Sequence, residues 1–109
     1  MVEIKKSEIH GVGIFATESI EAGKCIGLAY TLIGMVNGKY IAKWTEDAFT
    51  DLGQYHNHSI KPSAEPKIVD GKEVYLHARV KIKSGMEITC NYNEYSKIIN
   101  IEKPNPDWK

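Results

Sequence analysis

Two short polar segments contain the residues most able to do chemistry in this chain. The first is Asn-His-Ser at 57–59, with Pro62 three residues beyond, and the second ends at Tyr92. A tyrosine phenol is polar enough to orient an amine and stays neutral near pH 7. Its oxygen can also accept weak hydrogen bonds from polarised methyl hydrogens. Taken alone, these residues would be interpreted as a strand-edge tyrosine and a polar turn.

A metal site and a dinucleotide-binding fold are both poorly supported. His56 and His58 form a His-x-His pair, but no carboxylate or cysteine completes a ligand set nearby, so no metal is predicted. Gly11-Val12-Gly13 lets the backbone approach a ligand closely. The glycine pair does not extend to Gly-x-Gly-x-x-Gly and has no βαβ context, which excludes a Rossmann fold.

The bulk composition predicts one small globular domain over 1–109, with a core in about 3–95 and a tail in 96–109. Apolar residues make up 42% and charged residues 26%, which is typical of a folded chain. The 14 basic and 14 acidic residues give a formal net charge of zero, so nothing indicates nucleic acid or anionic membrane as a partner. A core this small is expected to gain from a bound ligand or a homodimer contact.

Cysteine usage and the N-terminal residues predict a cytoplasmic location. Cys25 and Cys90 form no Cys-x-x-Cys and are too few for a disulfide framework or a zinc cluster. Cys90 has no evident basic partner and is interpreted as a core thiol. The first residues lack the apolar run of a signal peptide, and no stretch reaches the roughly 20 apolar residues of a membrane span.

Short strands joined by glycine turns predict a mostly β fold. Asn-Gly at 37–38 and Asp-Gly at 70–71 stand between apolar runs, which is the strongest short hairpin signal because both turn positions need positive φ. Segment 19–26 resembles segment 81–88, as if one turn device were used twice. The single expected helix runs from Thr45, as its cap, to Leu52. Strands are expected at 2–5, 13–16, 25–33 and 74–82.

The order of three segments resembles the SET domain, a β-rich family of S-adenosylmethionine-dependent protein lysine methyltransferases. The segments are Gly-Val-Gly-Ile-Phe-Ala at 11–16, Asn-His-Ser at 57–59 with Pro62, and Gly-Met-Glu-Ile-Thr-Cys-Asn-Tyr at 85–92. The resemblance covers about residues 3–95, and the short chain is similar in size to the small free-standing members that occur in viruses and bacteria. It implies the SET-domain (β-clip) fold, in which several short sheets end in a C-terminal pseudoknot that brings 57 and 92 together.

The resemblance further implies methyl transfer from S-adenosyl-L-methionine to a lysine side-chain amine of a protein or peptide. A free lysine has a pKa of ~10.4, so a dry channel beside a sulfonium must disfavour its charged form. By the same resemblance Tyr92 is the catalytic residue. The cofactor contacts would come from Gly11, Val12, Gly13, Asn57, His58 and Tyr95, and the walls of the lysine channel from Tyr30, Tyr92 and Tyr95.

Two departures from the family pattern leave other hypotheses open. Ser63 follows Pro62 where the family usually has asparagine, and the segment between Tyr30 and Asn57, which often shapes the substrate groove, is short. A second hypothesis is therefore a non-catalytic SET-like domain that binds a cofactor or a peptide. A third is a small structural or oligomerisation domain whose glycine turns are only turns.

Overall fold

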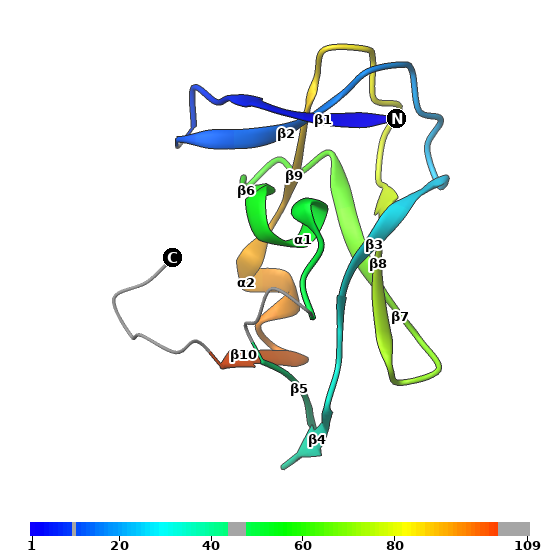
Figure 1. Cartoon of the computed structure of the whole chain (residues 1–109). Helices are drawn as coiled ribbons and strands as arrows, with labels where there is room; N and C mark the ends of the chain where they lie inside the picture. The colour runs from blue at the N-terminus through cyan, green and yellow to red at the C-terminus, as the bar shows by residue number, and fades with distance from the viewer. Residues whose placement is uncertain (10, 44–47, 103–109) are drawn as a thin grey trace.

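The described residues form three small sheets and two short helices (Figure 1). The computed structural model describes residues 1–9, 11–43 and 48–102. No helix in this part of the chain is long and apolar enough to cross a membrane. The elements are β1 Val2–Lys6, β2 Val12–Ala16, β3 Cys25–Thr31, β4 Gly34–Val36, β5 Lys39–Lys43, α1 Asp51–Tyr55, β6 Asn57–His58, β7 Ala64–Val69, β8 Glu73–Ala78, β9 Glu87–Cys90, α2 Tyr92–Tyr95 and β10 Ile99–Glu102. The expected mostly β architecture is confirmed.

The first sheet, in the order β1-β2-β9-β6, joins segments that are far apart in the sequence. β1 pairs antiparallel with β2, and β2 pairs antiparallel with β9. β6 then pairs parallel with β9, placing Asn57 opposite Thr89 and His58 opposite Cys90. This pairing brings the Asn-His segment to within two residues of Tyr92.

The second sheet, in the order β3-β8-β7, contains the expected alternating strand. Val74, Leu76 and Ala78 of β8 all face the core. The strand ends at Ala78, however, so the expectation that it reaches Ile82 was wrong: the chain turns there and leaves Val80 47% exposed. β3 likewise ends at residue 31 instead of 33.

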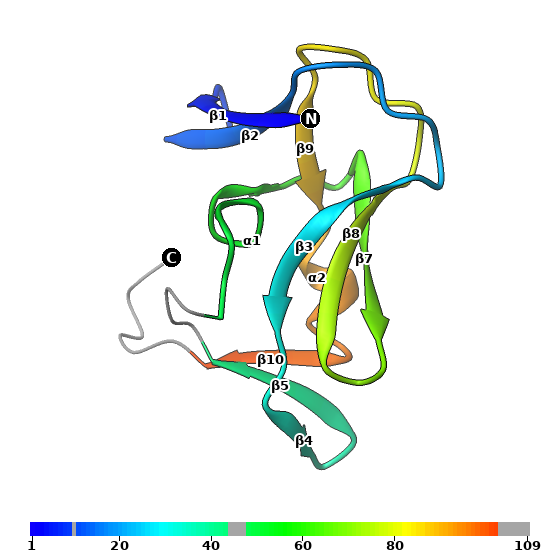
Figure 2. The same ribbon diagram turned by 45° about the vertical axis from the view of Figure 1, so that its right-hand side comes forward.

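The two similar segments of the sequence pair with each other. Ile20 and Ile82 form an isolated antiparallel bridge, with both N–H···O bonds at 2.8 Å. Gly23 and Gly85 occupy equivalent turns at φ 85° and φ 90°, a conformation in which a Cβ is unfavourable. Figure 2 shows the two loops side by side at one end of the molecule. The bridge holds the two loops together, and the side chains of both isoleucines are buried in the core.

The third sheet, in the order β10-β5-β4, combines a local hairpin with a distant strand. The β4–β5 hairpin turns through Asn37 and Gly38 at φ 53° and φ 81°, as the sequence predicts. β10 pairs parallel with β5, and no local pattern indicated this pairing. Apolar side chains from all three sheets meet in one core that includes Ile14, Tyr30, Phe49, Leu76, Ile82, Ile88, Cys90 and Ile99.

The helix prediction was wrong over 48–50 and at its end, because the observed α1 runs from Asp51 to Tyr55. The predicted cap, Thr45, lies outside the described residues. The Thr50 hydroxyl caps α1 by accepting a hydrogen bond from the Gly53 amide at 3.2 Å. Phe49 does not belong to a helix: it bridges to Tyr30, and the two rings stack at 4.5 Å between centroids.

Gly53 lets α1 approach β3 closely, and replacing it tests this packing. A Cβ at Gly53 would fall on the Ala29 carbonyl, 2.7 Å from its carbon atom, and a backbone group cannot rotate away. We expect Gly53→Ala to lower the free energy of unfolding by about 1–3 kcal/mol in urea titrations, because the core is overpacked. Gly27→Ala is the control, since its Cβ would meet Leu52 at an ordinary 3.5 Å. Equal stability of the two variants would contradict the close approach.

Candidate functional site

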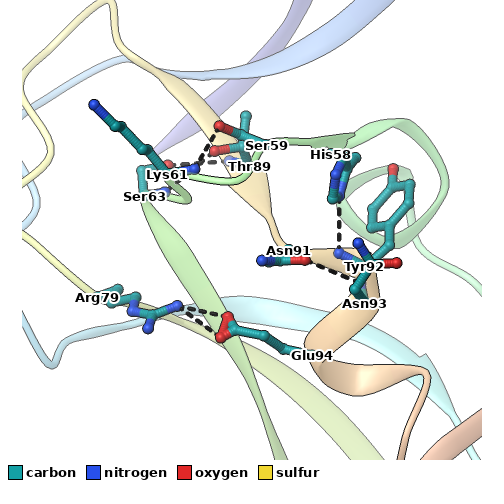
Figure 3. Close-up of polar contacts among 10 residues, drawn as sticks. All are labelled: His58, Ser59, Lys61, Ser63, Arg79, Thr89, Asn91, Tyr92, Asn93 and Glu94. Atoms are coloured by element: carbon teal, nitrogen blue, oxygen red, sulfur yellow. Dashed lines mark hydrogen bonds and ion pairs between the residues drawn. The ribbon is translucent and has the colours of Figure 1, made fainter.

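Tyr92 stands where β9 ends and α2 begins, and backbone contacts fix its position. The Asn91 side chain caps α2 by accepting from the Asn93 amide at 3.0 Å. The Tyr92 amide donates to Nδ1 of His58 at 3.0 Å, and the two rings lie 5.1 Å apart (Figure 3). The proton of the neutral His58 ring is therefore on Nε2. β6 thus holds the first residue of α2 directly.

The phenol of Tyr92 is neutral and oriented. Its hydroxyl donates to the backbone carbonyl of His56 at 2.5 Å, and the His56 ring packs edge-on against the tyrosine ring at 5.6 Å. Burial, then the Cys90 thiol, then the Glu87 carboxylate raise the pKa of Tyr92 to about 12. Because 38% of the residue remains exposed, an incoming group can reach it.

His56 is a buried neutral residue beneath the site. Its Nδ1–H donates to the Leu52 carbonyl at 2.8 Å, which places the ring against the C-terminal end of α1. Burial lowers the pKa of the imidazole below its ordinary value, although carbonyl contacts to Leu52 and Gly53 partly oppose that effect. Sequence analysis considered His56 only as half of a metal pair. In the described part of the chain, no three His, Cys, Asp or Glu side chains are placed to hold a metal ion.

The lowered pKa of His56 predicts a pH-dependent stability. Below about pH 6.5 the unfolded chain binds a proton at this residue while the folded chain does not, so the free energy of unfolding falls as the pH drops. The loss is at most ~1.4 kcal/mol per pH unit and ends at the folded-state pKa. Urea titrations of the protein and of His56→Asn at several pH values from 8 to 5 measure it. We expect a shallower pH slope in the variant; identical slopes would contradict the assignment.

Asn57 is oriented by three acceptors around its amide nitrogen. Nδ2 donates to a Glu87 carboxylate oxygen at 2.7 Å, and lies 3.1 Å from both the Ser7 hydroxyl and the Val12 carbonyl. Only the nitrogen of the amide can donate to a carboxylate, so the oxygen must be on the other branch. The Ser7 hydroxyl donates to the same carboxylate at 2.8 Å. Sequence analysis assigned no role to Ser7 or Glu87, and no short-range pattern connects residues 80 positions apart.

The two motif glycines have different surroundings. A Cβ at Gly13 would come within 2.9 Å of the Glu87 carboxyl carbon and 3.0 Å of the Asn57 amide nitrogen. Gly13 therefore makes room for the carboxylate–amide pair. Gly11 is exposed at φ 46°, in a turn that favours glycine. Contact of Gly11, Val12 and Gly13 with a cofactor stays a prediction.

Ser63, the departure from the family pattern, fastens its segment to β9. Its hydroxyl donates to the Glu87 carbonyl at 2.9 Å and accepts from the Thr89 amide at 3.0 Å. In return, the Thr89 hydroxyl accepts from the Ser63 amide at 3.1 Å. These bonds are buried or partly buried beside the β6–β9 pairing. The serine therefore supports the site instead of disrupting it.

Replacing Ser63 tests whether these hydrogen bonds hold β9. Ser63→Ala leaves the buried Thr89 amide without its acceptor, so we expect the free energy of unfolding to fall by about 1–3 kcal/mol. Chemical denaturation measures the change. Ser59→Ala serves as the matched control, because among the described residues the Ser59 hydroxyl accepts from the exposed Lys61 amide alone, and its loss should cost less than ~0.5 kcal/mol. Similar losses in both variants would rule out the special role of Ser63.

The other two predicted channel residues are Tyr30 and Tyr95. Tyr30 is less exposed to solvent than Tyr92, and the side chain of Tyr95 is not described. Tyr30 is 1% exposed, and its hydroxyl has no hydrogen-bond partner among the described residues. Burial and the neighbouring Cys90 thiol raise the pKa of Tyr30. Cys90 is itself fully buried with a thiol pKa raised to about 12, as a core thiol requires. The side chain of Tyr95 lies outside the described residues, so its two predicted roles stay predictions.

Helix α2 is also attached to the second sheet. Arg79, just beyond β8, pairs with Glu94 of α2 at 2.6 Å (Figure 3). Both side chains are more than 40% exposed, at 42% and 47%, so the pair adds little stability. The contacts of β6 are therefore the main restraint on Tyr92.

The fold and the arrangement of the Asn-His and tyrosine segments define a known class of protein. The SET domain family model matches residues 11–93. The chain belongs to the SET domain family, so the family resemblance stated from the sequence is confirmed, while the small free-standing viral or bacterial type stays a prediction.

The known proteins that this chain resembles include ones named as methyltransferases. It is 27% identical over 119 residues to the Caenorhabditis elegans histone-lysine N-methyltransferase set-2, covering 84% of this chain but 8% of that protein. A candidate histone methyltransferase of Plasmodium falciparum superposes with a TM-score of 0.63 at 21% identity, covering 84% of this chain and 96% of that one. Polycomb Repressive Complex 2 of Chaetomium thermophilum, bound to S-adenosylmethionine, gives a TM-score of 0.65 at 24% identity, covering 86% and 15%. The two solved structures establish the SET-domain fold.

Proposed function

We propose that the protein transfers a methyl group from S-adenosyl-L-methionine to a lysine side-chain amine of a protein. The observation that carries the proposal is the neutral, oriented phenol of Tyr92, held beside the Asn-His segment by the β6–β9 pairing. Membership of the SET domain family supports it. The methyltransferase names of the relatives support the same reaction class, although the chain spans only a small part of set-2.

The donor set of the site fits this cofactor. S-adenosyl-L-methionine, when bound, supplies an electrophilic methyl on a sulfonium and leaves as a thioether. It also carries an ammonium group, for which the oriented amide of Asn57 is a suitable acceptor. His58, whose Nδ1 is occupied by the Tyr92 amide, offers its backbone and its Nε2–H. Gly11, Val12, Gly13 and Tyr95 remain proposed contacts.

Tyr92 would position the amine. Its own proton is donated to the His56 carbonyl, so the phenol oxygen faces an incoming lysine as an acceptor. With a pKa of about 12, the phenol stays neutral near pH 7 and adds no charge of its own. The buried Tyr30 hydroxyl is a second polar group near Cys90 that we propose for the channel wall. Apolar walls disfavour the ammonium form, which leaves a neutral nucleophilic amine.

Protein lysines are the proposed substrates, and histones are the first to test. The relative set-2 is named a histone-lysine N-methyltransferase. The chain segment between Tyr30 and Asn57, which would shape the substrate groove, is short. We propose that the resulting compact groove makes few side-chain contacts with the peptide, so that affinity comes from backbone pairing with a strand edge. A homodimer remains part of the proposal.

Labelled methyl transfer tests the function. Protein with radiolabelled S-adenosyl-L-methionine is incubated with histones and with a cell extract, and the products are identified by mass spectrometry. We expect Tyr92→Phe to reduce kcat on the order of 10²-fold with little change in cofactor affinity, because the amine loses its orienting oxygen. Tyr75→Phe is the control, since its hydroxyl contacts only Glu73 among the described residues.

Three outcomes separate the hypotheses. Cofactor binding without transfer to any substrate would favour the binding-module alternative. No thermal stabilisation by saturating S-adenosyl-L-methionine would favour the purely structural one. Unchanged turnover in Tyr92→Phe would assign the catalytic position to another residue.

A further inference from the structure

Glu87 is a carboxylate satisfied by neutral donors. Its oxygens accept from the Ser7 hydroxyl at 2.8 Å and from the Asn57 amide at 2.7 Å. Within the described part of the chain, no lysine, arginine or histidine lies within ion-pair distance of it. Hydrogen bonds from neutral groups orient the carboxylate and stabilise it, but they leave its negative charge in place.

Another carboxylate near the site is neutralised. Glu94 on α2 pairs with Arg79 at 2.6 Å. The charge of Glu94 is therefore largely cancelled by its partner, whereas no described residue cancels that of Glu87. Glu87 is also less exposed to solvent than Glu94, so its field is screened less by water and salt.

The field of Glu87 reaches the catalytic position. Its charge is one of the three causes that raise the pKa of the Tyr92 phenol, after burial and Cys90. Its nearest amide, Asn57, is the residue proposed to accept from the cofactor. The carboxylate therefore lies next to the Asn57 amide and close enough to act electrostatically on the phenol.

We propose that Glu87 is a positioning residue that makes the site favour a positively charged cofactor over its uncharged product. The inference rests on the proposed function. S-adenosylmethionine has a cationic sulfonium and S-adenosylhomocysteine has a neutral thioether, while their ammonium, carboxylate and adenosine groups are the same. At the sulfur position, an unneutralised carboxylate attracts the sulfonium of S-adenosylmethionine but not the neutral thioether of S-adenosylhomocysteine. The attraction disappears when the methyl group leaves, which would assist product release.

Isothermal titration calorimetry with both ligands tests the proposal without requiring catalysis. Glu87→Gln keeps the shape of the side chain and removes its charge. We expect the ratio of the S-adenosylmethionine to S-adenosylhomocysteine affinities to fall on the order of tenfold. Glu87→Asp keeps the charge but shortens the reach to Asn57, so both affinities should fall while their ratio changes little.

Controls separate this proposal from simpler explanations. Glu94→Gln removes a carboxylate that Arg79 already neutralises, and its ratio should match the unmodified protein. An unchanged ratio in Glu87→Gln, with both affinities reduced equally, would overturn the proposal and leave Glu87 a purely structural role. If neither ligand binds the unmodified protein, the proposed function fails with it. Should Glu87→Gln not fold, the unmodified protein decides: it should bind S-adenosylmethionine more tightly than S-adenosylhomocysteine, and equal or reversed affinities would overturn the proposal.

Discussion

The candidate site depends on a parallel pairing of two residues between β6 and β9. Asn57 lies opposite Thr89 and His58 opposite Cys90. A two-residue ladder is weak alone, so side chains reinforce it. Ser63 bonds to the backbone of β9 on one side, and the Tyr92 amide bonds to His58 on the other. Both sets of contacts join the same two segments, which makes the position of the phenol insensitive to the loops around it.

A glycine and neutral hydrogen-bond donors position the Glu87 carboxylate in the site. Gly13 leaves space that the Glu87 carboxyl group and the Asn57 amide occupy. Glu87 in turn fixes which branch of the amide is its oxygen. His56 presents a carbonyl to the phenol while its own ring stays neutral in the core. Among the described residues, the groups that contact the Glu87 carboxylate are thus uncharged and polar.

Sequence alone predicted the features that depend on local chemistry. The hairpins at Asn37 and Asp70 followed from residues that accept positive φ, and the buried face of β8 followed from alternation. The predicted end of β8 and the predicted start of α1 were wrong. Ile82 and Phe49 instead form isolated bridges to Ile20 and Tyr30, and such tertiary pairing cannot be read from the local sequence. Asn57 and Tyr92 were found through the resemblance to the SET family, not through any spacing rule. Ser7 and Glu87 were missed as a pair, since only the folded chain brings a serine hydroxyl to a carboxylate 80 residues away.

The link from Ser7 to Glu87 has a kinetic consequence. Closing a loop of this length is entropically costly, and contacts between distant residues form slowly. The hydroxyl, amide and carboxylate come from three regions of the sequence, so a partly folded chain lacks the complete cluster. Ligand affinity should consequently appear only at the last stage of refolding, and the bound molecule would act as a reporter that the whole domain has reached its native state.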